Sequence, residues 1–255
     1  MNYRLEGSGE TLVFIHGLSD SLLYWEFLAT HLKEDYQILR VDLRGHGDSE
    51  LGSDEITLDT YVQDLKDLLD ELKIQNVNLI GFSLGSIVAL DFAGKYPEAV
   101  SSLVLMSSFY RIDDHLEDVF TRFKKALENS FEEFYDLILP MILCPEVIED
   151  NKEELELLKA IASETANTQA YIKAIDASLN VDFESNLSQI NIPTLLLAGK
   201  YDDITLVDVQ KDLHSRVENS EIVIFEDAKH NLLVGNNNLK ILDILKKFYK
   251  KRKEE

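Results

Sequence analysis

Short runs of apolar residues alternate along this chain with longer amphipathic segments, and this order restricts the fold more than any other feature. Each run has four or five residues, is rich in β-branched residues or leucine, and is bounded by Gly, Asp, Pro or Ser, as in buried strands. The six runs are residues 11–15, 37–41, 77–80, 102–106, 194–198 and 221–225. Segments between them, such as 58–72, carry apolar residues at helical spacing. This alternation predicts a mostly parallel α/β sheet with helices on both faces.

The alternation is interrupted between residues 109 and 184, where the periodicity is helical and no strand is predicted. A helical block between two strands of one sheet must return to that sheet, which is typical of a cap over its edge. Pro140 and Pro145 are expected to divide the block into separate helices. We therefore predict a core domain of residues 1–108 and 185–255 and a helical cap, or lid, of residues 109–184. The alternative is a helical decoration without a role at the site.

A glycine-flanked serine lies between the predicted strand 77–80 and a segment with a helical pattern. The string is Gly81-Phe82-Ser83-Leu84-Gly85. A sharp strand-to-helix turn forces the serine backbone into a strained conformation, and glycines two positions before and after it avoid steric clashes. Such a turn exposes the serine oxygen at the carboxyl edge of the sheet, beside the free N–H groups of a helix N-terminus. The string therefore predicts Ser83 as a nucleophile.

Together with this turn, four further features resemble the α/β-hydrolase superfamily, in particular its capped esterase, lactonase and C–C hydrolase branch. They are FIHGL at 14–18, Trp25, DLRGHGDS at 42–49 and PTLLLAGKYD at 193–202, in the family's order over nearly the whole chain. The resemblance implies the α/β-hydrolase fold with the cap inserted after the sixth strand. Apart from Met1, only residues 2–6 precede Gly7, and we expect the family's first, antiparallel edge strand to be missing. Ser86 stands where the family often has a second Gly, and we expect its small side chain to fit.

A serine hydroxyl needs a base to act as a nucleophile, and the base needs an orienting acid. His230 follows the last predicted strand, which would place it at the carboxyl edge together with Ser83. The resemblance puts the acid three residues after Gly199 and so selects Asp202, with the adjacent Asp203 as the alternative. The chain order of serine, acid and histidine is the one expected for this fold.

Two backbone N–H groups are needed to stabilise the oxyanion of a tetrahedral intermediate. The amide of Leu84 begins the predicted helix, and the resemblance implies the amide of Leu18 as the second donor. His16 and His46 lie in turns with glycine, where we expect their rings to hydrogen-bond to the backbone. For the substrate pocket we predict five apolar lining residues: Trp25, Phe109, Tyr110, Phe134 and Leu139.

The chain is strongly acidic, since 47 Asp and Glu residues stand against 25 Lys and Arg residues and give a net charge of −22. This charge disfavours nucleic acids and anionic membranes as partners. Residues 113–156 alone carry 14 acidic and 4 basic side chains. We therefore expect a small, neutral, fairly apolar substrate, no nucleic-acid or membrane partner, and a monomer or homodimer. One cysteine, Cys144, excludes an intramolecular disulfide and multi-cysteine metal sites, and it favours a cytoplasmic location.

These features predict a serine carboxylesterase that cleaves small esters or lactones through an acyl-enzyme, with no cofactor and no metal. The serine nucleophile disfavours the reactions of the similar epoxide hydrolases and haloalkane dehalogenases, which use Asp. Two alternatives stay open. The same triad fits a C–C bond hydrolase or an amide or peptide hydrolase, and the fold alone also fits a non-catalytic ligand receptor.

Overall fold

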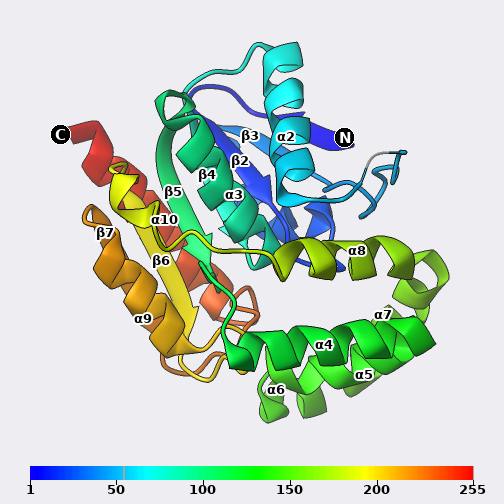
Figure 1. Cartoon of the computed structure of the whole chain (residues 1–255). Coiled ribbons are helices and arrows are strands. Elements are labelled where there is room, and N and C mark those ends of the chain that lie inside the picture. Colours follow the sequence, from blue (N-terminus) through cyan, green and yellow to red (C-terminus); the bar gives the residue numbers. More distant parts are fainter. Residues whose placement is uncertain (54, 255) are drawn as a thin grey trace.

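A seven-stranded sheet forms the centre of the computed structural model, which describes residues 1–53 and 55–254 (Figure 1). The strand order is β1-β3-β2-β4-β5-β6-β7, in which β1 runs antiparallel to β3 and the other neighbours are parallel. The strands are β1 (Tyr3–Glu6), β2 (Thr11–Ile15), β3 (Gln37–Val41), β4 (Val77–Phe82), β5 (Val100–Met106), β6 (Thr194–Gly199) and β7 (Ser220–Phe225). The predicted α/β fold with a mostly parallel sheet is confirmed, and so are all six predicted strands.

The antiparallel edge strand β1 is present, which corrects the expectation that this strand is missing. It pairs with β3 from Tyr3 opposite Val41 to Glu6 opposite Ile38. Three of its four side chains are exposed and the fourth is half-buried, so no apolar pattern marks it as a strand.

The expected place of the insertion is also corrected, because the inserted helices follow β5, the fifth strand in the chain, and not the sixth.

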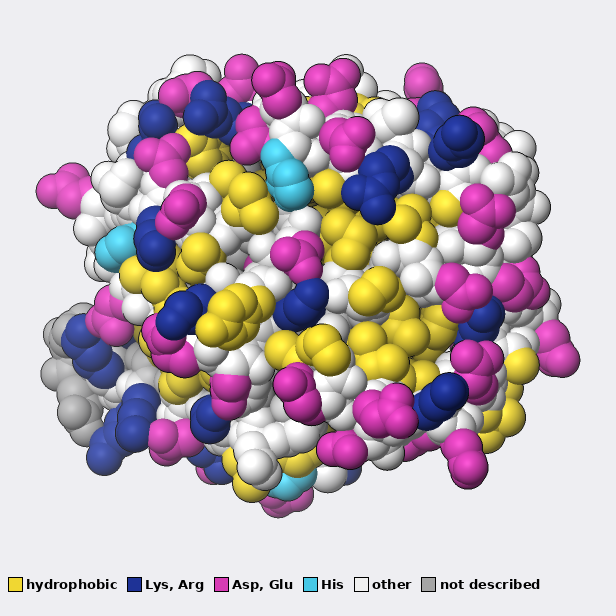
Figure 2. Space-filling model, turned by 90° about the horizontal axis from the view of Figure 1, so that it is seen from below, with side chains coloured by type: hydrophobic (Ala, Val, Ile, Leu, Met, Phe, Trp, Pro, Cys, Tyr) yellow, Lys and Arg dark blue, Asp and Glu magenta, His cyan; other side chains and the backbone are white. Residues whose placement is uncertain are grey.

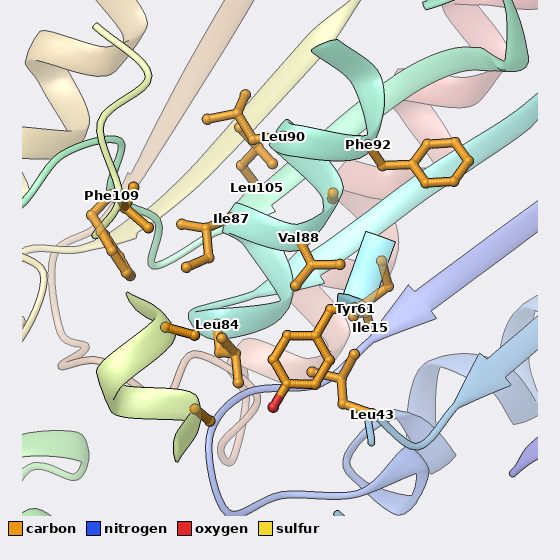
Figure 3. Close-up of a cluster of buried hydrophobic side chains, with 14 of the residues drawn as sticks. Ile15, Leu43, Tyr61, Leu84, Ile87, Val88, Leu90, Phe92, Leu105 and Phe109 are labelled. Atoms are coloured by element: carbon orange, nitrogen blue, oxygen red, sulfur yellow. The ribbon is translucent and has the colours of Figure 1, made fainter. Parts of the chain in front are cut away.

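Each face of the sheet has its own hydrophobic core, because successive side chains of a strand point to opposite faces. Val13 and Ile15 of β2 point to the face covered by α2, α3 and α9, and Figure 3 shows part of this cluster. Leu12 and Phe14 point to the other face, which α1 and α10 cover. The helices are α1 (Glu26–Leu32), α2 (Leu58–Leu72), α3 (Leu84–Lys95), α9 (Val207–Arg216) and α10 (Asn237–Glu254), with 3₁₀ turns at Leu22–Trp25, Pro97–Ala99 and Leu187–Gln189.

Five helices form the insertion between β5 and β6, and they extend past the carboxyl ends of the strands (Figure 1). They are α4 (Asp114–Asn129), α5 (Phe131–Ile142), α6 (Pro145–Asp150), α7 (Lys152–Thr165) and α8 (Thr168–Ser178). Pro145 begins α6 as predicted, whereas Pro140 lies inside α5 and does not end it. The buried side chains of α4, α5 and α8 join the same cluster as α2 and α3, so the insertion shares its core with the sheet. No helix in the described ranges is long and apolar enough to span a bilayer.

Trp25 is part of the core under α1 and α10, which corrects its prediction as a pocket residue. Its side chain is fully buried, and its ring centroid lies 5.1 Å from that of Phe14. The indole Nε1–H has no hydrogen-bond partner in the described residues. The bulky side chain therefore packs the back of the sheet and does not border a substrate.

Replacing Trp25 tests this assignment. We expect Trp25→Ala to lower the free energy of unfolding by about 3–5 kcal/mol, the usual cost of removing a large buried ring. Trp25→Phe should cost less, because it keeps an aromatic contact with Phe14 and removes the unpartnered N–H. Urea unfolding followed by circular dichroism measures both. A loss below about 1 kcal/mol in Trp25→Ala would contradict the assignment.

Candidate active site

Ser83 occupies the turn between β4 and α3 in a strained backbone conformation, with φ +50° and ψ −114°. A side chain at Gly81 would collide with the backbone of Gly85, and one at Gly85 would collide with the carbonyl of Ile15. Both positions therefore require glycine. The Ser83 N–H donates to the carbonyl of Met106 over 2.9 Å, which fixes the turn to the neighbouring strand.

Ser86 supports this turn, a role that the sequence analysis did not foresee. Its side chain is fully buried. Its hydroxyl oxygen lies 2.5 Å from the carbonyl oxygen of Ser83 and 2.9 Å from the hydroxyl oxygen of Ser108. The small side chain fits as expected, and it also provides a hydrogen bond that a second glycine could not make.

The loops after β6 and β7 bring Asp202 and His230 together. His230 Nδ1 lies 3.0 and 2.9 Å from the two carboxylate oxygens of Asp202. The carboxylate is fully buried, and it accepts hydrogen bonds from the amides of Ile204 and Thr205, at 2.9 Å each, and from the Thr205 hydroxyl at 2.8 Å. Because a carboxylate only accepts, the neutral ring carries its proton on Nδ1 and keeps the lone pair of Nε2 available.

The two adjacent carboxylates of the loop after β6 have different partners, and only Asp202 contacts His230 in the described residues. Asp203 forms an ion pair with Lys229, whose Nζ lies 2.6 Å from the Asp203 carboxylate. The Asp203 side chain is half exposed. Lys229 also donates to the carbonyl of Pro140 over 2.7 Å, and the amide of Asn231 donates to the carbonyl of Ile142 over 3.0 Å. The end of α5 is therefore attached to the residues on both sides of His230.

A cavity of about 330 Å³ lies between the sheet edge and the insertion. Ser83, His230, Leu18 and Leu84 border it, with no hydrogen bond between the serine hydroxyl and the imidazole in the described part of the chain. Its wall is mostly apolar and comes largely from the insertion. The predicted residues Phe109, Phe134 and Leu139 line it, together with Phe120, Phe123, Phe131, Ile138, Ile142, Leu155 and Leu158.

Tyr110 does not border the cavity, which corrects its prediction as a pocket residue. The side chain is fully buried, its hydroxyl hydrogen-bonds to Asp212 of α9, and Arg216 lies over its ring. Tyr110 thus fixes the start of the insertion to the core. Its aromatic character alone could not distinguish this position from the neighbouring Phe109.

Asp20 is a residue of this site that the sequence analysis missed. It borders the cavity two residues after Leu18, and burial raises the pKa of its carboxyl to about 7 while the charge of His230 opposes this shift. The signal in the sequence was an acidic residue three positions after Gly17, directly behind a predicted oxyanion donor.

His16 and His46 hydrogen-bond to the backbone, as predicted. His16 Nδ1 lies 2.7 Å from the carbonyl of Gly17, and its Nε2 accepts from the amide of Leu43 at 3.0 Å. His46 Nδ1 lies 3.1 Å from the carbonyl of Arg44. Burial lowers the pKa of His16 to about 4 and that of His46 to about 3, so both rings are neutral near pH 7.

These two histidines predict a loss of stability in acid. Their folded pKa values lie below the usual 6.5, so the unfolded chain binds protons that the folded chain excludes as the pH falls below about 6.5. Each contributes up to about 1.4 kcal/mol of lost unfolding free energy per pH unit. We expect His46→Gln to show a smaller slope than the wild type in urea unfolding between pH 4.5 and 6.5. Parallel curves for the two proteins would refute the prediction.

Comparisons with known proteins agree with this architecture. Residues 10–139 match the family model described as alpha/beta hydrolase fold. A putative carbamate hydrolase, RutD, from Pseudomonas syringae pv. syringae (strain B728a) is 32% identical over 224 residues, which are 86% of this chain and 86% of that protein. The chain belongs to the alpha/beta hydrolase family.

Solved structures of this family resemble the chain over almost its whole length. The enol-lactonase from Burkholderia xenovorans LB400 superposes with a TM-score of 0.89 at 20% identity, covering 98% of this chain and 96% of that one. The esterase EaEST from Exiguobacterium antarcticum gives 0.87 at 22% identity, covering 97% and 94%. At these identities the similarity shows the fold alone. Within residues 1–53 and 55–254, no group of three His, Cys, Asp or Glu side chains is placed to hold a metal ion.

Proposed function

We propose that this alpha/beta hydrolase is a serine esterase that cleaves small, neutral, fairly apolar carboxylic esters or lactones through an acyl-enzyme. One observation supports this most directly. The strained Ser83 and the Asp202-bound His230 border one mostly apolar cavity. A serine at a strand-to-helix turn, a histidine with a free Nε2 and a buried carboxylate behind it are the groups that acyl transfer needs.

In the proposed reaction, Ser83 Oγ attacks the ester carbonyl while His230 Nε2 removes its proton. The amides of Leu18 and Leu84 stabilise the resulting oxyanion, since both residues border the cavity and the first amides of a helix have no partner within it. His230 then gives the proton to the leaving alcohol, which leaves an acyl group on Ser83. A water molecule activated by His230 releases the acid, and Asp202 holds the imidazole throughout.

We also propose that residues 109–184 act as the lid of this site, with residues 1–108 and 185–255 as the core domain. Helices α4, α5 and α7 supply most of the apolar wall, which would limit the access of bulk water to the site and bind an apolar acyl or alcohol group. A cavity of about 330 Å³ suits a small substrate. The esterase and the enol-lactonase of similar fold act on bonds of this class.

Variants of two of the three proposed catalytic residues, Ser83 and Asp202, test the mechanism. We expect Ser83→Ala and Asp202→Asn each to lower kcat/KM for p-nitrophenyl butanoate by about 10⁴-fold or more, because the triad works as a unit. Asp203→Asn is the matched control and should stay within about tenfold of the wild type. Circular dichroism verifies that each variant is folded. An equal loss in Asp202→Asn and Asp203→Asn would contradict the proposed acid.

The apolar wall predicts a dependence on acyl length. We expect kcat/KM for p-nitrophenyl esters to rise by about fourfold per added methylene until the cavity is filled, and then to fall. Leu139→Ala should shift the optimum to longer chains because it enlarges the cavity. Leu157→Ala, at an exposed position of α7 outside the cavity, should leave the optimum unchanged. An optimum that moves equally in both variants would refute the proposed pocket.

A further inference from the structure

One carboxyl group borders the cavity beside the proposed reaction centre without taking part in the proposed mechanism. Asp20 lies two residues after Leu18, and its Oδ2 would be 3.5 Å from a side-chain atom added at Gly17. This places the carboxyl next to the segment that would hold the oxyanion. Its carboxylate accepts no hydrogen bond and forms no ion pair within the described residues, in contrast to Asp202 and Asp203 nearby.

No Lys or Arg side chain is among the titratable groups that interact electrostatically with this carboxyl in the described residues. These groups are the imidazole of His230 and the phenols of Tyr24 and Tyr171. Burial raises the pKa of Asp20 to about 7, and the Asp20 charge helps to raise that of Tyr24. An unpaired carboxylate beside an apolar wall is costly, and a cation that enters the cavity would relieve this cost.

The surroundings of the cavity favour the same sign of charge. Residues 113–156 of the insertion carry 14 acidic and 4 basic side chains, and acidic groups are spread over the face seen from below in Figure 2. Such a field concentrates cations near a cleft and repels anions. The long-range charge and the Asp20 carboxylate at the cavity wall therefore act in the same direction.

We propose that Asp20 is the charge-selecting residue of this cavity and that it favours esters with an ammonium group a few bonds from the scissile carbonyl over neutral esters, and neutral esters over carboxylate-bearing ones. The inference rests on the proposed esterase function and revises its substrate class, because it places ammonium-bearing esters ahead of the neutral esters proposed above. The Asp20 carboxylate attracts the ammonium group of the substrate electrostatically, and it does not act as a base for Ser83.

Three matched substrates test the proposal: the phenyl esters of 3-aminopropanoate, butanoate and hydrogen succinate. We expect the wild type to cleave the ammonium ester with the highest kcat/KM and the succinate ester with the lowest. Asp20→Asn should lower the ratio of ammonium to neutral ester by about tenfold, the usual effect of a charged hydrogen bond, and should raise the rate for the succinate ester. Asp208→Asn removes the same charge from an exposed side chain of α9 and should leave the ratios unchanged.

Two further measurements keep the test decisive if Asp20→Asn does not fold. In the wild type, the ammonium-to-neutral ratio should rise several-fold from pH 6 to pH 8, because Asp20 ionises through its raised pKa, whereas effects of His230 cancel in the ratio. Calorimetry on Ser83→Ala should show tighter binding of butylammonium than of butanoate, independently of turnover.

The outcomes separate the inference from the function on which it rests. If butanoate is cleaved by the wild type and not by Ser83→Ala, while the ratios are the same in Asp20→Asn and flat with pH, then the esterase stands and the role of Asp20 is wrong. If the wild type cleaves none of the three esters, the proposed function fails and the inference fails with it.

Discussion

The contact between His230 and Asp202 joins two loops at the end of the sheet, and the geometry of the site depends on it. A buried carboxylate loses several kcal/mol of hydration, which is offset here by four donors: the imidazole, two amides and the hydroxyl of Thr205. Three of these donors come from residues two or three positions after Asp202. The loop after β6 therefore fixes the position of the Asp202 carboxylate, and this carboxylate in turn orients the imidazole of His230.

The parallel sheet explains why distant segments meet at this point. Every parallel strand ends at the same edge, so the turn after β4 and the loops after β6 and β7 are neighbours although residues 83 and 230 are far apart in sequence. The insertion adds a second constraint, since Lys229 and Asn231 bind the carbonyls of Pro140 and Ile142. A movement of α5 would therefore pull on the residues that flank His230, and the proposed lid and the proposed base are mechanically linked.

Much of this arrangement could be read from the sequence, because buried strands and tight turns leave local signals. The apolar runs located six strands, and Gly81 and Gly85 located the turn whose steric reason the structure shows. The features that were predicted wrongly or missed left no local signal in the sequence. The strand β1 is exposed, so its backbone pairing leaves no apolar pattern. Trp25 and Tyr110 are aromatic like true cavity residues, and only the packing of the whole chain places them in the core. Asp20 was missed because an isolated acid near a motif is indistinguishable from a surface residue until its burial is known.

The most direct test of the central claim is covalent labelling of the nucleophile. The protein would be treated with a fluorophosphonate, digested, and mapped by mass spectrometry alongside the Ser83→Ala variant. The account predicts one modified peptide, which contains Ser83, and no modification in the variant. Equal labelling of the two proteins, or a label on another serine, would contradict it.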